Sequence, residues 1–153
     1  MPQTTQNPDL SRFHLFDRNG RVKGVYDWEV CRYLRETQDY FVLGGVPYLY
    51  GNGCYRADET GAKLKDMIQA CLYPEFIKSP TIRRVYDLAV GSAACRETFD
   101  GLNRCPPQWI NFQNGFYDPV SGMMYPHHPR YRAVNQIPHY FDPAARPRGD
   151  TVE

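Results

Sequence analysis

A chain of 153 residues is the size of one ordinary domain, and its 42% hydrophobic and 14% aromatic content indicates a folded protein with a core. The formal net charge of +1 excludes a strongly basic DNA-binding domain, so any contact with nucleic acid must be local, depend on oligomerisation or be absent. No apolar run approaches a membrane span and residues 1–10 lack the layout of a signal peptide, which predicts a cytoplasmic protein.

The first elements in chain order are a hairpin and a helix. Residues 1–10 are polar and without periodicity, and we expect them to be disordered or extended. Apolar residues at 13–16 and 22–25 flank the turn sequence of residues 17–20, which predicts a small hairpin. A helix is predicted next, over residues 28–37, with the preceding aspartate as its N-cap.

A second hairpin is predicted in the middle of the chain. Residues 41–43 form a short strand of the buried type, which Gly44-Gly45 ends. Residues 46–50 and 54–57 then face each other across Gly51-Asn52-Gly53, a strong hairpin signal.

Two amphipathic helices follow this hairpin. The first begins at Asp58, Glu59 or Thr60 and ends before Pro74, with apolar side chains at helical spacing between. The second is predicted from Ser79 as its N-cap, with a proline at its first helical position and a glycine at its end.

The C-terminal third predicts one more hairpin. The apolar residues of its strands flank two turn signals, Asn114-Gly115 and the segment 118–122, and we expect Asn114-Gly115 to bend the entering strand. Pro126 and Pro129 end the strands because proline has no backbone N–H to donate. A further strand is predicted at residues 131–134.

Together the patterns predict an α+β protein of one domain, with three short antiparallel hairpins packed with about three helices. We expect the strand around Trp109 to pack on the two amphipathic helices. The contacts predicted there join Trp109, Ile110 and Phe112 to Leu64, Ile68, Val85 and Tyr86.

The five cysteines are predicted to be free thiols. Their number is odd, and no two have the short spacing of zinc ribbons or redox motifs. With no secretory signal, disulfides are not expected. Cys31, Cys54 and Cys71 stand among apolar neighbours and are interpreted as small buried hydrophobic residues.

The sequence shows no recognisable pattern for catalysis or for binding a cofactor or metal. No segment has the form G-x-x-x-x-G-K-[ST] that cradles nucleotide phosphates, and no G-x-S-x-G motif is present. His127 and His128 are adjacent in a proline-flanked loop, where neighbouring side chains point to opposite sides. We therefore interpret His127 as a residue that fixes the hairpin end by hydrogen-bonding backbone, and predict no catalytic residue, no metal and no cofactor.

The candidate nucleic-acid contacts are cationic and hydroxyl side chains. Four of them lie at the start of the second amphipathic helix, where free N–H groups and the helix dipole favour anions; a solvated helix face is the plainer alternative. The full set is Lys78, Thr81, Arg83, Arg84, Arg130 and Arg132. Tyr48, Tyr50 and Tyr55 could stack on bases, but we favour packing roles for them, since no basic run accompanies them.

Two sets of motifs extend over nearly the whole chain. An Asn-Gly pair, an apolar strand, a Gly-containing turn, a second strand and Pro-His precede a segment ending in Tyr-Phe-Asp-Pro; the residues are Asn114, Gly115, Gly122, Pro126, His127, Pro138, Tyr140, Phe141, Asp142 and Pro143. Upstream lie residues 24–27, 41–48 and 77–82. In this order and spacing the chain resembles the domain that precedes the superfamily-three helicase motor in phage, plasmid and poxvirus primase-helicases.

The resemblance implies a helicase-associated domain at residues 11–141, between a disordered N-terminus at 1–10 and a linker or frayed tail at 142–153. It implies a non-catalytic accessory module that contributes to collar assembly or DNA handling beside the motor of an ATP-dependent helicase or primase. Expected partners are DNA, bound weakly as single strand or duplex, and the motor or other replication proteins. A homo-oligomer is a further possibility, no membrane is expected, and the expected location is the cytoplasm of a bacterial host.

Two other readings stay open. A stand-alone winged-helix-like regulator of a phage or mobile element would insert the helix at residues 79–90 into DNA, with the second hairpin as its wing. A small enzyme would need a pocket that gathers His127 or His128 with acidic residues. Whether the chain is an excised fragment or a complete gene product also stays open.

Overall fold

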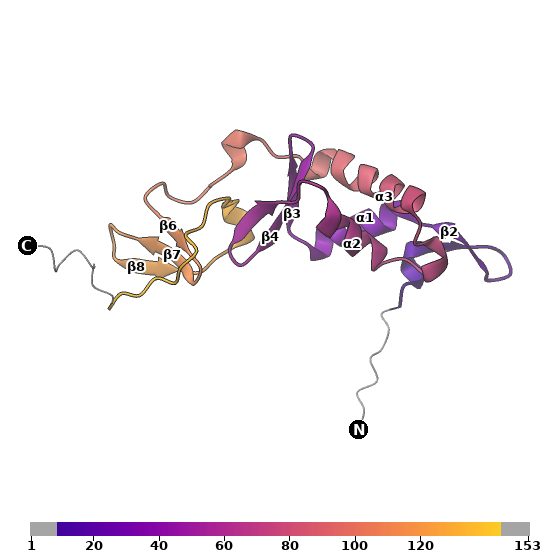
Figure 1. Ribbon diagram of the computed structural model, residues 1–153, viewed down its shortest axis with the longest axis horizontal. Helices are drawn as coiled ribbons and strands as arrows, with labels where there is room; N and C mark the ends of the chain where they lie inside the picture. Colours follow the sequence, from indigo (N-terminus) through magenta and orange to yellow (C-terminus); the bar gives the residue numbers. More distant parts are fainter. Residues whose placement is uncertain (1–8, 145–153) are drawn as a thin grey trace, which may run out of the picture. The chain divides into compact units, whose positions relative to one another are not determined.

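The structure is a computed structural model that describes residues 9–144, and the predictions for residues 1–8 and 145–153 lie outside this range (Figure 1). The predicted α+β class is confirmed, because three α-helices and three small antiparallel sheets make up the described residues. The chain forms two compact units. Unit 1 comprises the described residues up to Leu49 and Ala57–Thr98, and unit 2 comprises Tyr50–Arg56 and the described residues from Phe99 onward.

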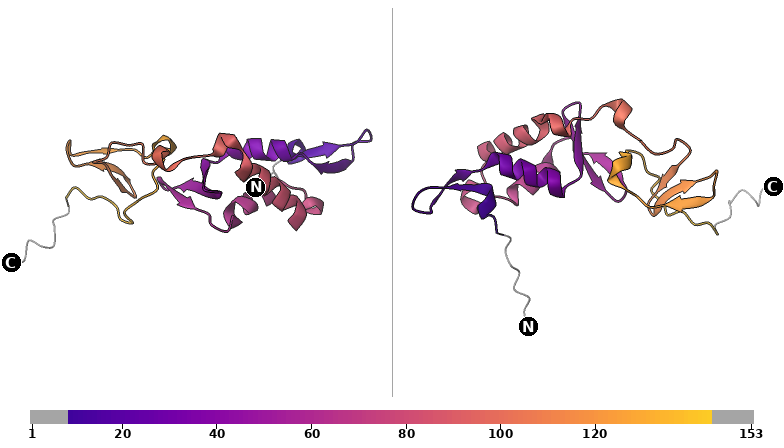
Figure 2. Two further views of the ribbon diagram at one scale, coloured as in Figure 1. Left: turned by 90° about the horizontal axis from the view of Figure 1, so that it is seen from above. Right: turned by 180° about the vertical axis from the view of Figure 1, so that it is seen from behind.

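Unit 1 begins with the predicted hairpin. Strands β1 (His14–Phe16) and β2 (Val22–Val25) pair antiparallel, and the hairpin extends from the helices of this unit (Figure 2). Leu10 precedes the hairpin and packs against the core, and its carbonyl accepts the Phe13 N–H at 3.1 Å.

Helix α1 (Asp27–Thr37) begins one residue earlier than predicted. Its N-cap position is Tyr26, which makes no side-chain capping bond, so the prediction of Asp27 as N-cap is wrong. The Asp27 carboxylate instead binds the guanidinium of Arg84, with 2.6 Å between Oδ2 and Nε. An aspartate in the first turn still favours the helix through the macrodipole.

Helix α2 (Ala62–Gln69) is shorter than predicted at both ends. Gly61, in the left-handed region at φ +73°, precedes it. Asp58, which lies before the helix, still satisfies its first turn, because its carboxylate accepts the N–H groups of Lys63 at 3.3 Å and Leu64 at 3.0 Å. Because the helix begins at Ala62, the prediction that it begins at Asp58, Glu59 or Thr60 is wrong.

Helix α3 (Ser79–Gly91) has its predicted proline in the first turn, but Ser79 is the first helical residue rather than the N-cap. The helices α1 and α2 both pack against α3. Their apolar faces form half of one buried cluster, whose members are Phe13, Val25, Val30, Cys31, Leu34, Tyr40, Val42, Leu64, Ile68, Cys71, Leu72, Val85, Ala89 and Cys95.

The second sheet is a meander of β3 (Tyr40–Leu43), β4 (Val46–Gly51) and β5 (Cys54–Ala57). Both Gly44 and Gly45 have positive φ, so the pair that was expected to end β3 also turns the chain into β4. The hairpin predicted across residues 51–53 is confirmed.

Unit 2 contains a third meander, of β6 (Ile110–Phe112), β7 (Gly115–Asp118) and β8 (Met123–Tyr125). Phe112 pairs with Gly115, so the chain reverses at Gln113-Asn114 and Gly115 begins β7; the prediction that Asn114-Gly115 bends the entering strand is wrong. The predicted strand at residues 131–134 is absent from the described chain, where Pro129–Tyr131 forms a 3-10 helix.

Trp109 belongs to an aromatic cluster of unit 2. Its ring stacks on Tyr125 with 4.4 Å between centroids and is tilted against Phe116 at 5.5 Å. Leu64 and Val85, its predicted partners, belong to the buried cluster of unit 1. Among the described residues, no helix is long and apolar enough to cross a membrane.

Candidate nucleic-acid interface

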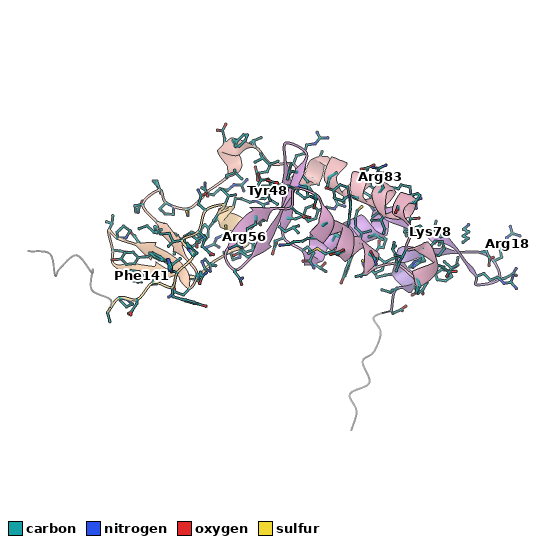
Figure 3. All side chains as sticks on the ribbon, in the orientation of Figure 1. Arg18, Tyr48, Arg56, Lys78, Arg83 and Phe141 are labelled. Carbon is teal, nitrogen blue, oxygen red and sulfur yellow. The ribbon has the colours of Figure 1, made fainter. Side chains whose placement is uncertain are left out.

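The start of α3 presents the cations predicted there. Lys78 and Arg83 are exposed, and neither has a polar partner among residues 9–144 (Figure 3). Thr81 is half-buried in the first turn. Pro80 removes one backbone N–H from this turn, but the remaining free N–H groups and the helix dipole still favour an anion. The chemistry of this surface suits a phosphate.

Arg84 is engaged by the protein itself. Its Nε and Nη2 donate to the Asp27 carboxylate at 2.6 and 3.1 Å, which ties the first turn of α1 to α3. This hydrogen bond raises the pKa of Arg84 above its ordinary value. The sequence predicts Arg84 as a DNA contact from its place at the start of the helix, but its charge is largely balanced by Asp27 in the folded chain.

Arg130 and Arg132 lie in unit 2, at the 3-10 helix and just after it. Arg130 is exposed, and its Nη2 donates to the Tyr131 hydroxyl at 2.9 Å. Arg132 is half-buried; its Nη1 donates to the Tyr55 hydroxyl at 2.8 Å and its guanidinium lies 5.4 Å from the centre of that ring. Arg132 therefore holds Tyr55 in place, while Arg130 keeps an exposed charge.

The tyrosines of the second hairpin serve packing. Tyr55 is 1% exposed, and Tyr50 is tilted against it with 5.0 Å between the ring centroids. Tyr48 stacks on Phe41 at 5.1 Å and is half-buried. These contacts agree with the packing interpretation and leave little ring surface for bases.

His127 fixes the third sheet as interpreted from the sequence. Its Nε2 lies 2.8 Å from both the Phe112 carbonyl and the Asn111 Oδ1, so it serves as the donor to both oxygens. Asn111 is buried, and its amide group donates to the carbonyls of Gly53 and Asn135 at 3.0 Å each. Sequence reasoning missed Asn111, since an Asn in a short strand carries no signal of its partners.

The motif residues of the C-terminal part are brought together by the fold. The side-chain amide of Asn114 donates to the Phe141 carbonyl at 3.0 Å, and its Oδ1 accepts the Phe141 N–H at 2.8 Å. This one side chain therefore satisfies both backbone groups of Phe141, as a neighbouring strand does in a sheet. A Cβ at Gly115 would lie 2.7 Å from the Tyr125 carbonyl oxygen, which explains the need for glycine. These residues build the fold of unit 2.

This set of fold-building residues lies inside the match to a known family. The family model described as "D5 N terminal like" matches residues 31–151. The chain belongs to this family. A comparison with curated proteins found no match.

D5 N terminal like domains are the N-terminal domains of phage and viral primase-helicases, which confirms the family resemblance inferred from the motifs. The match begins at residue 31, inside α1, and covers α2, α3 and the described part of unit 2 from Phe99 onward. Asn114, Gly115, His127 and Phe141 all lie within it.

A recess of unit 2 has a volume of about 430 Å³. Its walls include Trp109, Phe116, Asn111, Gln136 and Cys105, with no carboxylate and no histidine. Such walls offer apolar contact and amide hydrogen bonds. Among residues 9–144, no three His, Cys, Asp or Glu side chains gather to hold a metal ion.

The cysteines behave as buried packing residues. All five are free thiols, and Cys31, Cys54 and Cys71 are buried as predicted. Burial raises the pKa of Cys31 and of Cys71 to about 11, and it also raises the pKa of the half-buried Cys105. A thiol that keeps its proton is a poor nucleophile, which disfavours thiolate chemistry at Cys31 and Cys71 at neutral pH.

Proposed function

We propose that this D5 N terminal like domain is a non-catalytic accessory module of a phage-type DNA replication primase-helicase. It contributes to collar assembly or to DNA handling beside the ATP-dependent motor. The observation that carries the proposal is the family match over residues 31–151. The proposed partners are the motor or other replication proteins and DNA, with a homo-oligomer as one mode of assembly, in the cytoplasm of a bacterial host.

The roles of the polar side chains support a module without chemistry of its own. Burial opposes ionisation of Asp118, but hydrogen bonds from the Val120 N–H and from Ser121 outweigh it and lower the pKa of the carboxyl. That carboxylate shapes the β7–β8 loop. His127 is held by Asn111 and backbone, and both groups therefore serve the sheet.

DNA contact in this proposal begins at the start of α3. Lys78, Thr81 and Arg83 contribute there, and Arg130 contributes from unit 2. The residues predicted from the sequence as nucleic-acid contacts also include Arg84 and Arg132. Their guanidinium groups already bind Asp27 and Tyr55. We expect these two to add less to DNA affinity than the others.

The test is co-assembly with the motor. The chain would be co-expressed with the replication helicase encoded by the same replicon and analysed by size exclusion with light scattering. The proposal expects one complex that contains both proteins, with weak DNA binding by the chain alone. ATP hydrolysis by the purified chain would contradict the non-catalytic role.

A stand-alone DNA-binding regulator is the second candidate, favoured by the packing of α2 against α3 and by the exposed cations of α3. A connection that includes the 3-10 helix Pro74–Phe76 separates the two helices. A regulator should bind duplex tightly as a discrete dimer, with a steep loss of affinity as salt rises. The double substitution of Arg83 and Arg84 by Ala should abolish that binding, and unchanged affinity would remove α3 as the contact.

A further inference from the structure

The β1–β2 hairpin of unit 1 carries a dense group of cations. Arg18 and Arg21 lie in its turn and Lys23 lies in β2, and all three are exposed. Asp17, directly before Arg18, is the one acidic residue in the hairpin segment 14–25. The hairpin precedes residue 31, where the family match begins.

These three cations have no partner in the described part of the chain. Among residues 9–144, Arg18, Arg21 and Lys23 make no ion pair, hydrogen bond of the side chain or ring contact. Most other cationic side chains of the described chain are engaged, as Arg12 is by Glu29 at 2.6 Å and Arg84 is by Asp27. The hairpin therefore leaves its positive charge for something outside the chain.

The carboxylate of Asp17, the acidic residue of the hairpin, holds the turn together. Oδ1 of Asp17 accepts the N–H groups of Asn19 at 2.8 Å and Arg21 at 3.0 Å, and the Asp17 N–H donates to the Arg21 carbonyl at 2.8 Å. Gly20, at φ +78°, completes the turn. Such a turn is held in one conformation before any ligand arrives, which lowers the entropy cost of binding.

The base of the hairpin is anchored firmly. The ring of His14 stacks on Tyr73 with 4.0 Å between centroids. Its Nδ1 donates to the Leu10 carbonyl at 2.8 Å and its Nε2 accepts the Tyr73 N–H at 3.1 Å, which fixes the neutral tautomer with the proton on Nδ1. The hairpin is thus a stiff projection, and Figure 2 shows it extending from the helices of unit 1.

The anchor also joins the hairpin to the start of α3. His14 lies 5.5 Å from Phe76, ring centre to ring centre, and Phe76 precedes Lys78 by two residues. Lys78 is a further cation without a partner among the described residues. One end of unit 1 thus presents cations from two anchored elements, which Figure 3 marks with Arg18 and Lys78.

Apolar side chains accompany the charges. Leu15 and Phe16 are 41% and 40% exposed, and they lie in β1, which pairs with the strand that carries Lys23. Phe16 pairs with Val22 while Leu15 pairs with Gly24, so Lys23 sits at a bulge, where a strand re-aims its side chain. The major groove of DNA admits a two-stranded β-ribbon. Basic side chains beside an aromatic ring also suit the binding of a single strand.

We propose that the β1–β2 hairpin binds the sugar–phosphate backbone of nucleic acid through Arg18, Arg21 and Lys23, with Lys78 at its base. The proposal rests on the DNA-handling part of the proposed function and adds a contact surface for it. Phosphodiesters are the ligand because they offer closely spaced anions to a row of fixed cations. The single strand and the duplex are the two sources that the experiment separates.

The test is fluorescence anisotropy with the full chain and a labelled 20-nucleotide strand, alone or as duplex, over a series of salt concentrations. The hairpin variant is R18A/R21A/K23A, and the matched control K63A/K65A/R96A removes the same charge elsewhere in unit 1. For the affected probe, the slope of log affinity against log salt should become shallower by roughly 2 to 3 in the hairpin variant and stay unchanged in the control. The probe that shows this change identifies the nucleic acid that the hairpin contacts.

The single substitution Arg18→Glu guards against a folding defect, because Arg18 is exposed at the turn and makes no contact there. It should weaken binding at least about tenfold while the melting temperature stays unchanged. Equal affinity of wild type and both hairpin variants would overturn this inference and leave the proposed function standing. Absence of binding by wild type at low salt would also overturn it, whereas the proposed function then stands or falls on co-assembly with the motor.

Discussion

At the scale of single residues, Gly53 and His127 depend on each other. Gly53 has φ +81°, and a Cβ there would lie 2.4 Å from the His127 ring. That ring is held by the Phe112 carbonyl, so it has little freedom to move. Only glycine fits the hairpin tip while His127 holds the third sheet.

The first prediction follows from this contact. Gly53→Ala should lower the free energy of unfolding by about 2–4 kcal/mol, from left-handed strain plus overpacking against the ring. The control Gly122→Ala has φ +73° with nothing within 4 Å, and should cost only about 1–2 kcal/mol. Urea unfolding measures both, and equal costs would contradict the described contact.

The buried thiols give a prediction for alkaline pH. Burial raises the pKa of Cys31 and Cys71 from 9.0 to about 11, so between these values the folded state keeps protons that the unfolded state releases. Unfolding should therefore become easier as pH rises above about 9, by on the order of 2–3 kcal/mol in total at about pH 10. In the Cys31→Ala/Cys71→Ala variant, this pH dependence should shrink even though overall stability is lower. A pH slope that is the same in both proteins would contradict it.

At the scale of elements, two adjacent arginines of α3 have different roles. Arg83 is exposed without a partner among the described residues, and Arg84 pairs with Asp27 of α1. Arg83→Gln should weaken DNA binding severalfold, since a phosphate contact is lost. The double variant Asp27→Asn/Arg84→Gln removes a balanced pair, so it should leave affinity within about twofold and cost less than about 1 kcal/mol of stability. DNA titration of both variants tests this, and a larger effect from the double variant would reverse the roles.

The elements themselves were largely predictable from local patterns. The glycine and asparagine turns located the hairpins, and helical spacing located α2 and α3. Helix starts were less predictable, because Asp27 could cap α1 or pair with a distant cation, and its partner Arg84 lies 57 residues away. Asn114-Gly115 was assigned as a bend because the short β6 strand before it gives little periodicity.

The candidate site was predictable only in part, because some of its side chains have partners that are distant in sequence. Lys78 and Arg83 stand exposed where the helix start placed them. Arg132 meets Tyr55 across 77 residues of sequence, which no local pattern shows. The basic hairpin had a visible signal in Arg18 and Arg21, but the segment was interpreted only as a turn.

At the scale of the whole molecule, the net charge of +1 conceals a local excess of positive charge on the β1–β2 hairpin. Acidic residues such as Glu29 and Asp27 pair with arginines of the helices, so their charge does not offset the hairpin. The division into two units was not predictable from composition, because the aromatic cluster around Trp109 resembles any other stretch of core. The order of the motifs, by contrast, identified the family.

The central claim is that this chain works as an accessory of a replication motor. Sedimentation velocity of the labelled chain, with and without the helicase of the same replicon, tests it most directly. We predict that the labelled chain co-sediments with the motor as one larger species. The account would be contradicted if the labelled chain did not bind the motor and instead sedimented, when duplex DNA is added, as a dimer tightly bound to that DNA.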